Sequence, residues 1–349
     1  MKLIVLSVCA AIALASAIWA ESTDRTDVAV EKGARWLASV QGADGGWGQD
    51  GGETSYIRTG EHLESNGNDV ANTAVAALAL LRAGKQYQPN VERALGFILQ
   101  RVETSPLEGL QITNAQGTQI QRKLGPYIDT FLTSMLLSKV DGTLSKSTLN
   151  ARVRKALEKC VAKIERNQQT DGSWNVAGGW APVLGTSLAS RSLFEAKQKG
   201  VVVQDKVMRR AEDYTVQAIV NSAAPNVAAA SAGVGLYQSA QALEQLSRTD
   251  ADRRKNAKEI DAIRVQLKDA RFVEGFGSIG GEEFFSYLNV SDGLKRAGGP
   301  EWRQWHSQIT QKILNLQNND GTWAGHHCIT GRVAVTSAAI LNLTNDAAN

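Results

Sequence analysis

Three short stretches of sequence decide the fold of this chain: Gln41-Gly-Ala-Asp44-Gly45-Gly-Trp47, Gln168-Gln-Thr-Asp171-Gly172-Ser-Trp174 and Gln317-Asn-Asn-Asp320-Gly321-Thr-Trp323. Each reads QxxDGxW. An apolar residue lies four positions before each Gln, one helical turn away on the same face: Leu37, Ile164 and Ile313. Asp-Gly favours a turn, and Gly can take the positive φ that ends a helix. Each stretch is therefore expected to close a helix and to fold its Trp ring back into the core.

Two kinds of helical segment surround these motifs. The segments before them carry one apolar stripe and are polar elsewhere, which is typical of a half-buried helix. Two such stripes are Val153, Leu157, Cys160, Val161 and Ile164, and Trp302, Trp305, Ile309, Ile313 and Leu316. The segments 70–81, 226–243 and 333–343 are apolar or small on all sides and contain no charge. Such segments are expected in the interior.

Half-buried and fully buried helices alternate along the chain, so the sequence predicts six helix pairs with a period of about 50 to 60 residues. Their approximate bounds are 27–84, 90–140, 149–200, 204–248, 253–298 and 300–345. An open solenoid needs polar capping repeats, but the last pair is as apolar as the others. We therefore predict an all-α protein, an α/α toroid in which six outer helices surround six inner ones.

The composition is that of an ordinary globular protein, with 43% apolar and 21% charged residues among 349. A net charge of +3 is too small for the positive field that nucleic acid or an anionic membrane attracts. Nucleic acid is therefore not expected as a partner.

The first residues have the pattern of a secretory signal peptide. Lys2 precedes the uncharged run 3–20, and small residues at Ala15 and Ala17 offer a cleavage site. We predict a signal peptide over 1–20, a single toroid domain over 21–349, and an exported protein, secreted or periplasmic, with no membrane span after cleavage. Cys160 and Cys328 are then too few for a disulfide framework.

QxxDGxW after an amphipathic helix resembles the QW repeat of squalene and oxidosqualene cyclases and the related repeat of protein prenyltransferase β subunits. These families fold as α/α toroids, which agrees with the helix pairing. The resemblance implies that the motif residues are structural and tie the outer helices together: Gln41, Trp47, Gln168, Trp174, Gln317 and Trp323.

In a toroid the inner helices begin at one end, so polar residues before them surround one mouth where helix dipoles favour anions. Asp69, Asp129, Thr186 and Ser187 fall there. Asp69, Thr186 and Ser187 are also good helix N-caps, and Asp129 suits a first helical turn, so capping competes with a ligand-binding role.

Glu282 and Glu283 follow a Gly-rich turn and open a buried aromatic helix. They could act as acid and base, bind a metal, or complement the helix dipole. His326, His327 and Cys328 precede the last inner helix. In an extended segment residues 326 and 328 point the same way, so His326 and Cys328 could bind a divalent metal such as zinc. A Cys–His nucleophile and plain packing are the alternatives.

Three functions remain open on the sequence. The first is an exported relative of terpene cyclases and prenyltransferases that binds an isoprenoid or another apolar small molecule or lipid. The sequence, however, lacks the DxDD motif of squalene-hopene cyclases and the Asp-x-Cys motif of prenyltransferases. The second is a carbohydrate-active toroid that uses Glu282, Glu283 and Asp129. The third is a non-catalytic scaffold, because the fold alone does not fix the function.

Overall fold

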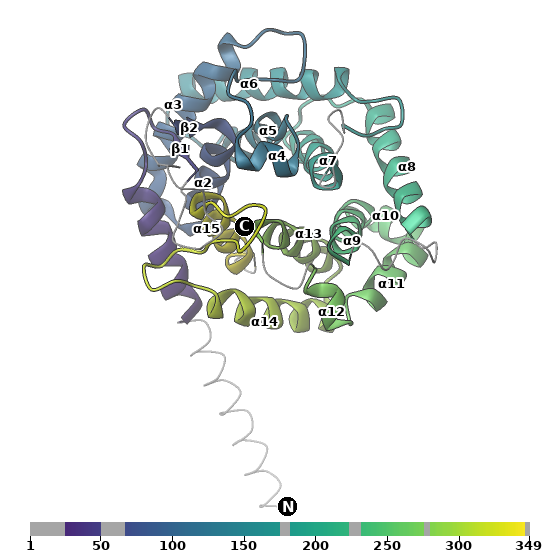
Figure 1. The fold of residues 1–349 in the computed structure, drawn as a ribbon. Coiled ribbons are helices and arrows are strands. Elements are labelled where there is room, and N and C mark those ends of the chain that lie inside the picture. Colours follow the sequence, from purple (N-terminus) through teal and green to yellow (C-terminus); the bar gives the residue numbers. More distant parts are fainter. Residues whose placement is uncertain (1–24, 50–66, 175–181, 223–231, 276–279, 346–349) are drawn as a thin grey trace, which may run out of the picture.

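The architecture is a closed double ring of helices (Figure 1). The computed structural model describes residues 25–49, 67–174, 182–222, 232–275 and 280–345. The predicted signal peptide over 1–20 lies outside these residues. Among the described helices, none is long and apolar enough to cross a membrane.

Six inner helices form the central ring. In chain order they are α2 (Val70–Ala83), α5 (Ile128–Val140), α7 (Pro182–Gln198), α9 (Ala232–Leu246), α13 (Gly281–Ala297) and α15 (Arg332–Leu343). Each packs against the next, and α15 packs against α2. The predicted all-α toroid is therefore confirmed. The predicted segments 70–81 and 333–343 lie within α2 and α15, whereas 226–231 lies outside the described residues.

The outer ring contains a helix over residues 25–39, then α3 (Gln88–Thr104), α6 (Ser147–Arg166), α8 (Asp205–Ser222) and α14 (Gly299–Asn315). At the fifth position the outer helix is broken into α10 (Asp250–Lys255), α11 (Ala257–Gln266) and α12 (Ala270–Val273). The breaks have local causes, because Asn256 leaves helical geometry and Asp269 caps α12 through its side chain.

Three short elements complete the described structure. A 3₁₀ turn (η2, Lys85–Tyr87) connects α2 to α3, and α4 (Gln119–Leu124) lies between α3 and α5. A two-stranded ribbon pairs β1 (Trp47–Gly48) with β2 (Asn68–Asp69). The ribbon holds Asp69 at the start of α2, opposite Trp47.

Each motif Trp joins an outer helix to an inner one. The indole Nε1 donates to the carbonyl four positions before the motif Gln: Trp47 to Leu37 (2.8 Å), Trp174 to Ile164 (2.7 Å) and Trp323 to Ile313 (2.7 Å). The backbone N–H of each Trp donates to a Thr hydroxyl of the following inner helix: Thr73 (2.9 Å), Thr186 (3.3 Å) and Thr336 (3.0 Å). All three rings are buried, so these bonds are shielded from water.

Each motif Gln joins one outer helix to another. Its Nε2 donates to the motif Gly carbonyl and to a carbonyl near the start of a second outer helix: Gln41 to Asn90 (3.0 Å), Gln168 to Val207 (2.9 Å) and Gln317 to Ala29 (2.9 Å). The third bond closes the outer ring, because Ala29 lies in the first outer helix and Gln317 follows the last.

The motif glycines fill places where no side chain fits. Gly172 has a φ of 93°, and a Cβ there would lie 2.2 Å from the carbonyl oxygen of Arg210 in α8. Gly200 also has a positive φ, of 76°, but a Cβ there would meet no atom within 4 Å. A comparison of alanine substitutions at these two positions therefore separates the cost of a strained backbone from the cost of a clash with the next outer helix.

We expect Gly172→Ala to lower the free energy of unfolding by more than the roughly 1 kcal/mol that a strained backbone alone costs. Gly200→Ala has the same kind of strain without the clash and is the matched control. Urea unfolding of both variants measures the difference. Equal losses in the two variants would show that Gly172 does not seat α8 against the motif.

Candidate functional site

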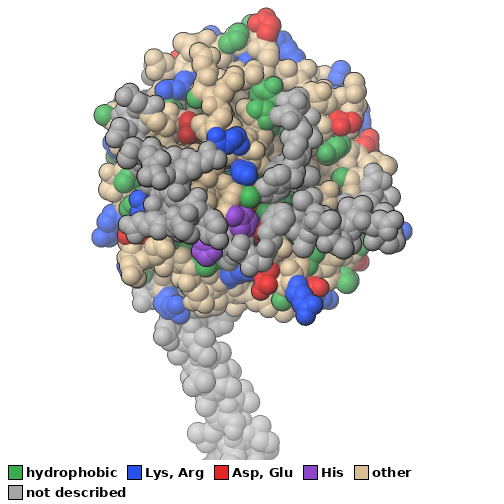
Figure 2. Space-filling model, in the orientation of Figure 1, with side chains coloured by type: hydrophobic (Ala, Val, Ile, Leu, Met, Phe, Trp, Pro, Cys, Tyr) green, Lys and Arg blue, Asp and Glu red, His purple; other side chains and the backbone are tan. Residues whose placement is uncertain are grey.

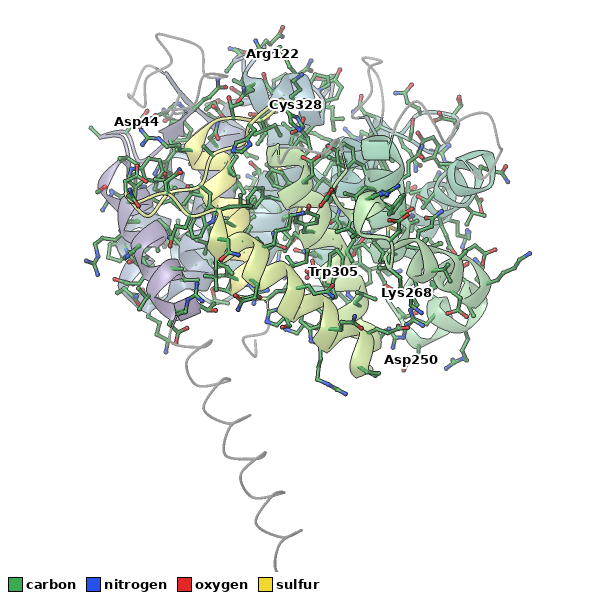
Figure 3. The ribbon with its side chains drawn as sticks, turned by 60° about the horizontal axis from the view of Figure 1, so that its bottom comes forward. Asp44, Arg122, Asp250, Lys268, Trp305 and Cys328 are labelled. Atoms are coloured by element: carbon green, nitrogen blue, oxygen red, sulfur yellow. The ribbon has the colours of Figure 1, made fainter. Side chains whose placement is uncertain are left out.

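The inner helices begin at one end of the ring, and the candidate residues gather there. Figure 3 shows Cys328 and Arg122 at this end, whereas Asp250 lies at the other. Histidine, lysine and arginine side chains lie near the middle of the face seen in Figure 2. The loop before α15 lies beside the start of α13, since the N–H of Gly281 donates to the carbonyl of Ile329 (2.9 Å). We call this end the mouth.

Glu283 caps the helix that it opens. Its Oε2 accepts from the N–H of Gly280 (2.9 Å), which is the contact of a capping box. Its Oε1 accepts from the hydroxyl of Tyr237 (3.2 Å) on the neighbouring α9. Burial and then the charge of Glu283 raise the pKa of Tyr237, so this phenol stays protonated as the donor. The Glu283 carboxylate thus has the structural role that was one of its predicted alternatives.

Glu282 is a buried acid that retains hydrogen-bonding capacity. Its Oε2 accepts from the N–H of Ile329 (3.2 Å), and no residue in the described part of the chain hydrogen-bonds to its Oε1. Burial and the nearby charge of Glu283 raise the pKa of Glu282 to about 7. At neutral pH this carboxyl is therefore poised to hold or release a proton.

Cys328 and His327 complete one cluster with Glu282. A carboxylate oxygen, a ring nitrogen and the thiol sulfur of these three residues lie within 4.8 Å of one another. His327 Nε2 is also 4.0 Å from Glu283 Oε1. Oxygen, nitrogen and sulfur are the donors that zinc takes, and three protein ligands with an open position are typical of catalytic zinc sites. Among the residues that the structure describes, these three are the ones that could hold a metal.

The thiol of Cys328 does not suit the nucleophile hypothesis. Burial and the neighbouring Glu282 raise its pKa to about 12, so it is protonated at neutral pH unless a metal replaces the proton.

The geometry changes one predicted ligand. We expected an extended segment that places His326 and Cys328 on the same side. Instead, the loop bends, and Cys328 has a φ of 56°, in the left-handed region. His327 is therefore the histidine beside Cys328, and His326 is exposed and lies outside the cluster.

Asp69 and Asp129 form a second acidic group. Asp69 Oδ1 accepts from the N–H of Asn72 (2.8 Å), so its predicted N-cap role is found. Asp129 Oδ1 accepts from the N–H of Ala71 (3.1 Å), and its Oδ2 accepts from Gln121 Nε2 (2.6 Å). Asp129 thus bridges α5, α2 and α4, a contact that its place in the sequence did not indicate.

Both aspartates are protonated more readily than free carboxyl groups. Burial raises the pKa of Asp69 to about 6. Burial and the charge of Asp69 together raise the pKa of Asp129 to about 7. Within the described residues, no hydrogen bond joins this pair to the Glu282 cluster, so the two acidic groups are separate.

Thr186 and Ser187 are not N-caps, because α7 begins at Pro182 and both residues lie inside it. The hydroxyl of Thr186 accepts a hydrogen bond from the backbone N–H of Trp174 (3.3 Å). The hydroxyl of Ser187 accepts from Asn289 Nδ2 (3.3 Å) on α13. Both side chains serve packing between elements.

The sequence reading missed a buried ion-pair network towards the other end of the inner helices. Arg191 of α7 contacts Glu195 (3.0 Å) and Asp292 of α13 (2.5 Å). In α9, Glu244 contacts Arg248 (2.6 Å) and also Arg296 of α13 (2.9 Å). Burial opposes ionisation of Glu244, but the arginines outweigh it and hold its pKa at about 2. The i,i+4 spacing of opposite charges in otherwise apolar helices was the available signal.

The ring and its motifs define a class of protein, the α/α toroid with QW-type repeats. The known proteins that this chain resembles agree with that class. The family described as the squalene-hopene cyclase C-terminal domain matches residues 7–116. The squalene–hopene cyclase of Bradyrhizobium diazoefficiens is 38% identical over 73 residues, which are 21% of this chain and 11% of that protein. The probable squalene–hopene cyclase of Sinorhizobium fredii is 34% identical over 82 residues, 24% and 12% of the two chains.

Residues 7–116 are therefore similar to the squalene-hopene cyclase C-terminal domain family, in agreement with the resemblance of the repeat motifs. It matches only about a ninth of the length of either relative.

The raised pKa values of the mouth carboxyls predict a pH effect on stability. In the unfolded state these carboxyls lose their protons from about pH 4, whereas in the folded state they keep them up to about pH 6 to 7. Their contribution to the free energy of unfolding therefore falls as the pH rises from about 4 to about 7. Asn imitates a neutral acid, so Asp129→Asn should gain stability relative to wild type between about pH 5 and pH 8. Chemical denaturation at both pH values measures the gain. The exposed Asp250→Asn is the control, and a gap between wild type and Asp129→Asn that does not change with pH would contradict the assignment.

The cluster geometry predicts zinc binding that depends on one histidine and not on its neighbour. Purified protein dialysed against zinc should retain one ion per chain, and His327→Ala or Cys328→Ser should weaken binding by at least about 10-fold. His326→Ala should bind like wild type. Competition with a zinc indicator measures all four affinities, and equal affinities throughout would remove the metal assignment.

Proposed function

We propose that this protein binds an apolar small molecule of the isoprenoid or lipid class at the mouth of the inner ring. One observation carries the proposal: a cluster of acid, imidazole and thiol lies at the mouth, where the inner helices α13 and α15 begin and bury mainly apolar and small residues. Ligand pockets typically combine an apolar lining with a few convergent polar groups and perturbed pKa values.

The arrangement of the cluster suggests how it would act. His327 and Cys328 are partly exposed, whereas Glu282 lies behind them and is fully buried. A ligand that enters the mouth would meet the imidazole and the thiol first. The Glu282 carboxyl is neutral below about pH 7 and could then donate a hydrogen bond or a proton through them.

Two features favour an apolar ligand. The first turns of α13 place Phe284, Phe285 and Tyr287 beside the acids, and all three rings are buried. The matched relatives are named as squalene–hopene cyclases, enzymes whose printed name refers to isoprenoid hydrocarbons. Because the chain lacks DxDD, we propose ligand binding at this site. Export through the segment 1–20 is part of the same proposal.

The test begins with protein purified from its own host and analysed by native mass spectrometry. We expect an added mass that organic extraction removes. The extracted protein should then bind farnesol or squalene, and the binding of farnesol, which has a hydroxyl, should weaken above about pH 7 as Glu282 ionises. In Glu282→Gln the pH dependence should disappear, whereas the partly exposed Glu301→Gln should keep it.

Absence of both retained and added isoprenoid would overturn the proposal. Binding of a neutral oligosaccharide at the mouth instead would also overturn it and would favour a carbohydrate-active toroid. Unchanged pH dependence in Glu282→Gln would show that this carboxyl takes no part in binding.

A further inference from the structure

A cavity lies on the outer side of the ring, apart from the Glu282 cluster. It has a volume of about 630 Å³ and lies between the last turns of α3 and the loop over residues 105–116 that leads towards α4. This volume is in the range of small-molecule sites. The connection passes beside α6 at the edge of the ring (Figure 1). None of its lining residues belongs to the cluster at the mouth.

Two lysines of α6 hold the first part of this loop. Lys159 Nζ donates to the carbonyl of Ser105 (2.5 Å), and Lys163 Nζ donates to the carbonyls of Pro106 (2.6 Å) and Glu108 (3.2 Å). Lys163 is only 1% exposed. Burying an ammonium group is costly unless its donors are satisfied, so the loop carbonyls and this lysine fix each other.

The second part of the loop is held from the inner ring and α4. The carbonyl of Leu110 accepts from Thr130 Oγ1 (2.6 Å), and the carbonyl of Ala115 accepts from Gln121 Nε2 (3.0 Å). Leu110 and Ile112 are buried as anchors. The wall of the cavity is therefore fixed at several points before any ligand arrives, which reduces the entropy that binding costs.

Arg101 supplies the charge of the cavity. Its guanidinium stacks on the ring of Phe97 at 3.2 Å and donates one bond to the Phe97 carbonyl (2.8 Å). Within the described part of the chain, no carboxylate forms an ion pair with it, and Asp44 acts on it only as a more distant charge. The stacked ring fixes the guanidinium plane and leaves the remaining N–H donors for a ligand.

The remaining polar lining consists of side-chain amides and hydroxyls. Gln100, Gln111, Asn114 and Gln116 line the cavity, and their amides have no side-chain hydrogen-bond partner among the residues that the structure describes. No Asp or Glu lines the cavity. Each amide both donates and accepts, which is what a ring of sugar hydroxyls requires.

We propose that this cavity binds a saccharide that carries a carboxylate, of the uronic acid type. The Arg101 fork matches a carboxylate in a planar, two-bond arrangement, and the amides match the hydroxyls around it. A peptide carboxyl terminus would share the first contact. It would also need an apolar pocket for its last side chain, and the cavity offers only the edges of Pro106, Ile112 and Ala115. This inference does not rest on the function proposed for the mouth.

Isothermal titration with digalacturonate tests the proposal on the full chain. We expect saturable binding, at least about 10-fold weaker binding in Arg101→Gln, and intermediate binding in Arg101→Lys, which keeps the charge but loses the fork. Arg166→Gln, an exposed arginine outside the cavity, is the matched control and should bind like wild type. Asn114→Ala removes an exposed amide without touching the core and should also weaken binding. This variant keeps the proposal testable if the Arg101 variants fold poorly.

Three results would overturn the proposal. Equal affinity for the methyl ester of digalacturonate would show that the carboxylate is not recognised. Wild-type affinity in Arg101→Gln and Asn114→Ala would place binding elsewhere. Displacement of digalacturonate by a short peptide with a free carboxyl terminus, at lower concentration than by the sugar itself, would assign the cavity to peptides.

Discussion

The side-chain amide of Gln317 donates to the carbonyl of Ala29, 288 positions away in the sequence, and this contact closes the outer ring. The same motif places Trp323 against Gly33, where a Cβ would lie 2.9 Å from the indole ring. An inner helix that is apolar on all sides needs neighbours on both flanks and an outer helix behind it. Because the ring is closed, α2 packs against α15, and neither helix needs the polar capping repeat that ends an open solenoid.

The closed ring also determines where chemistry can occur. Because the inner helices begin at one end, the loops before α13 and α15 meet there and bring Glu282, His327 and Cys328 into one cluster. Arg191 and Asn289 approach each other (3.2 Å) across the ring interior from α7 and α13, which are not neighbours in the ring. Towards the end opposite the mouth, the inner helices are joined by buried ion pairs. The mouth instead holds carboxyl groups with raised pKa values. The two ends therefore differ: one holds paired opposite charges, and the other holds carboxyls that are protonated more readily.

Much of the fold could be predicted because QxxDGxW combines turn chemistry with a helical spacing that the sequence displays directly. The break of the fifth outer helix could not, since it depends on local capping at Asn256 and Asp269. The toroid predicted from the sequence indicated that the polar residues before the inner helices surround one mouth. The choice of His327 over His326 depended on the left-handed backbone of Cys328, and residue spacing does not report backbone angles. The approach of Asp129 to Ala71 and Gln121 depends on how α2, α4 and α5 pack.

Ring closure by the third motif is the central claim, and amide hydrogen exchange measured by mass spectrometry on Gln317→Ala tests it most directly. The account predicts faster exchange both near residue 317 and in the helix over residues 25–39, at the opposite end of the sequence, with no such effect in the exposed Gln304→Ala. Faster exchange confined to the neighbourhood of residue 317 would contradict closure, because the first outer helix would then hold its place without this contact.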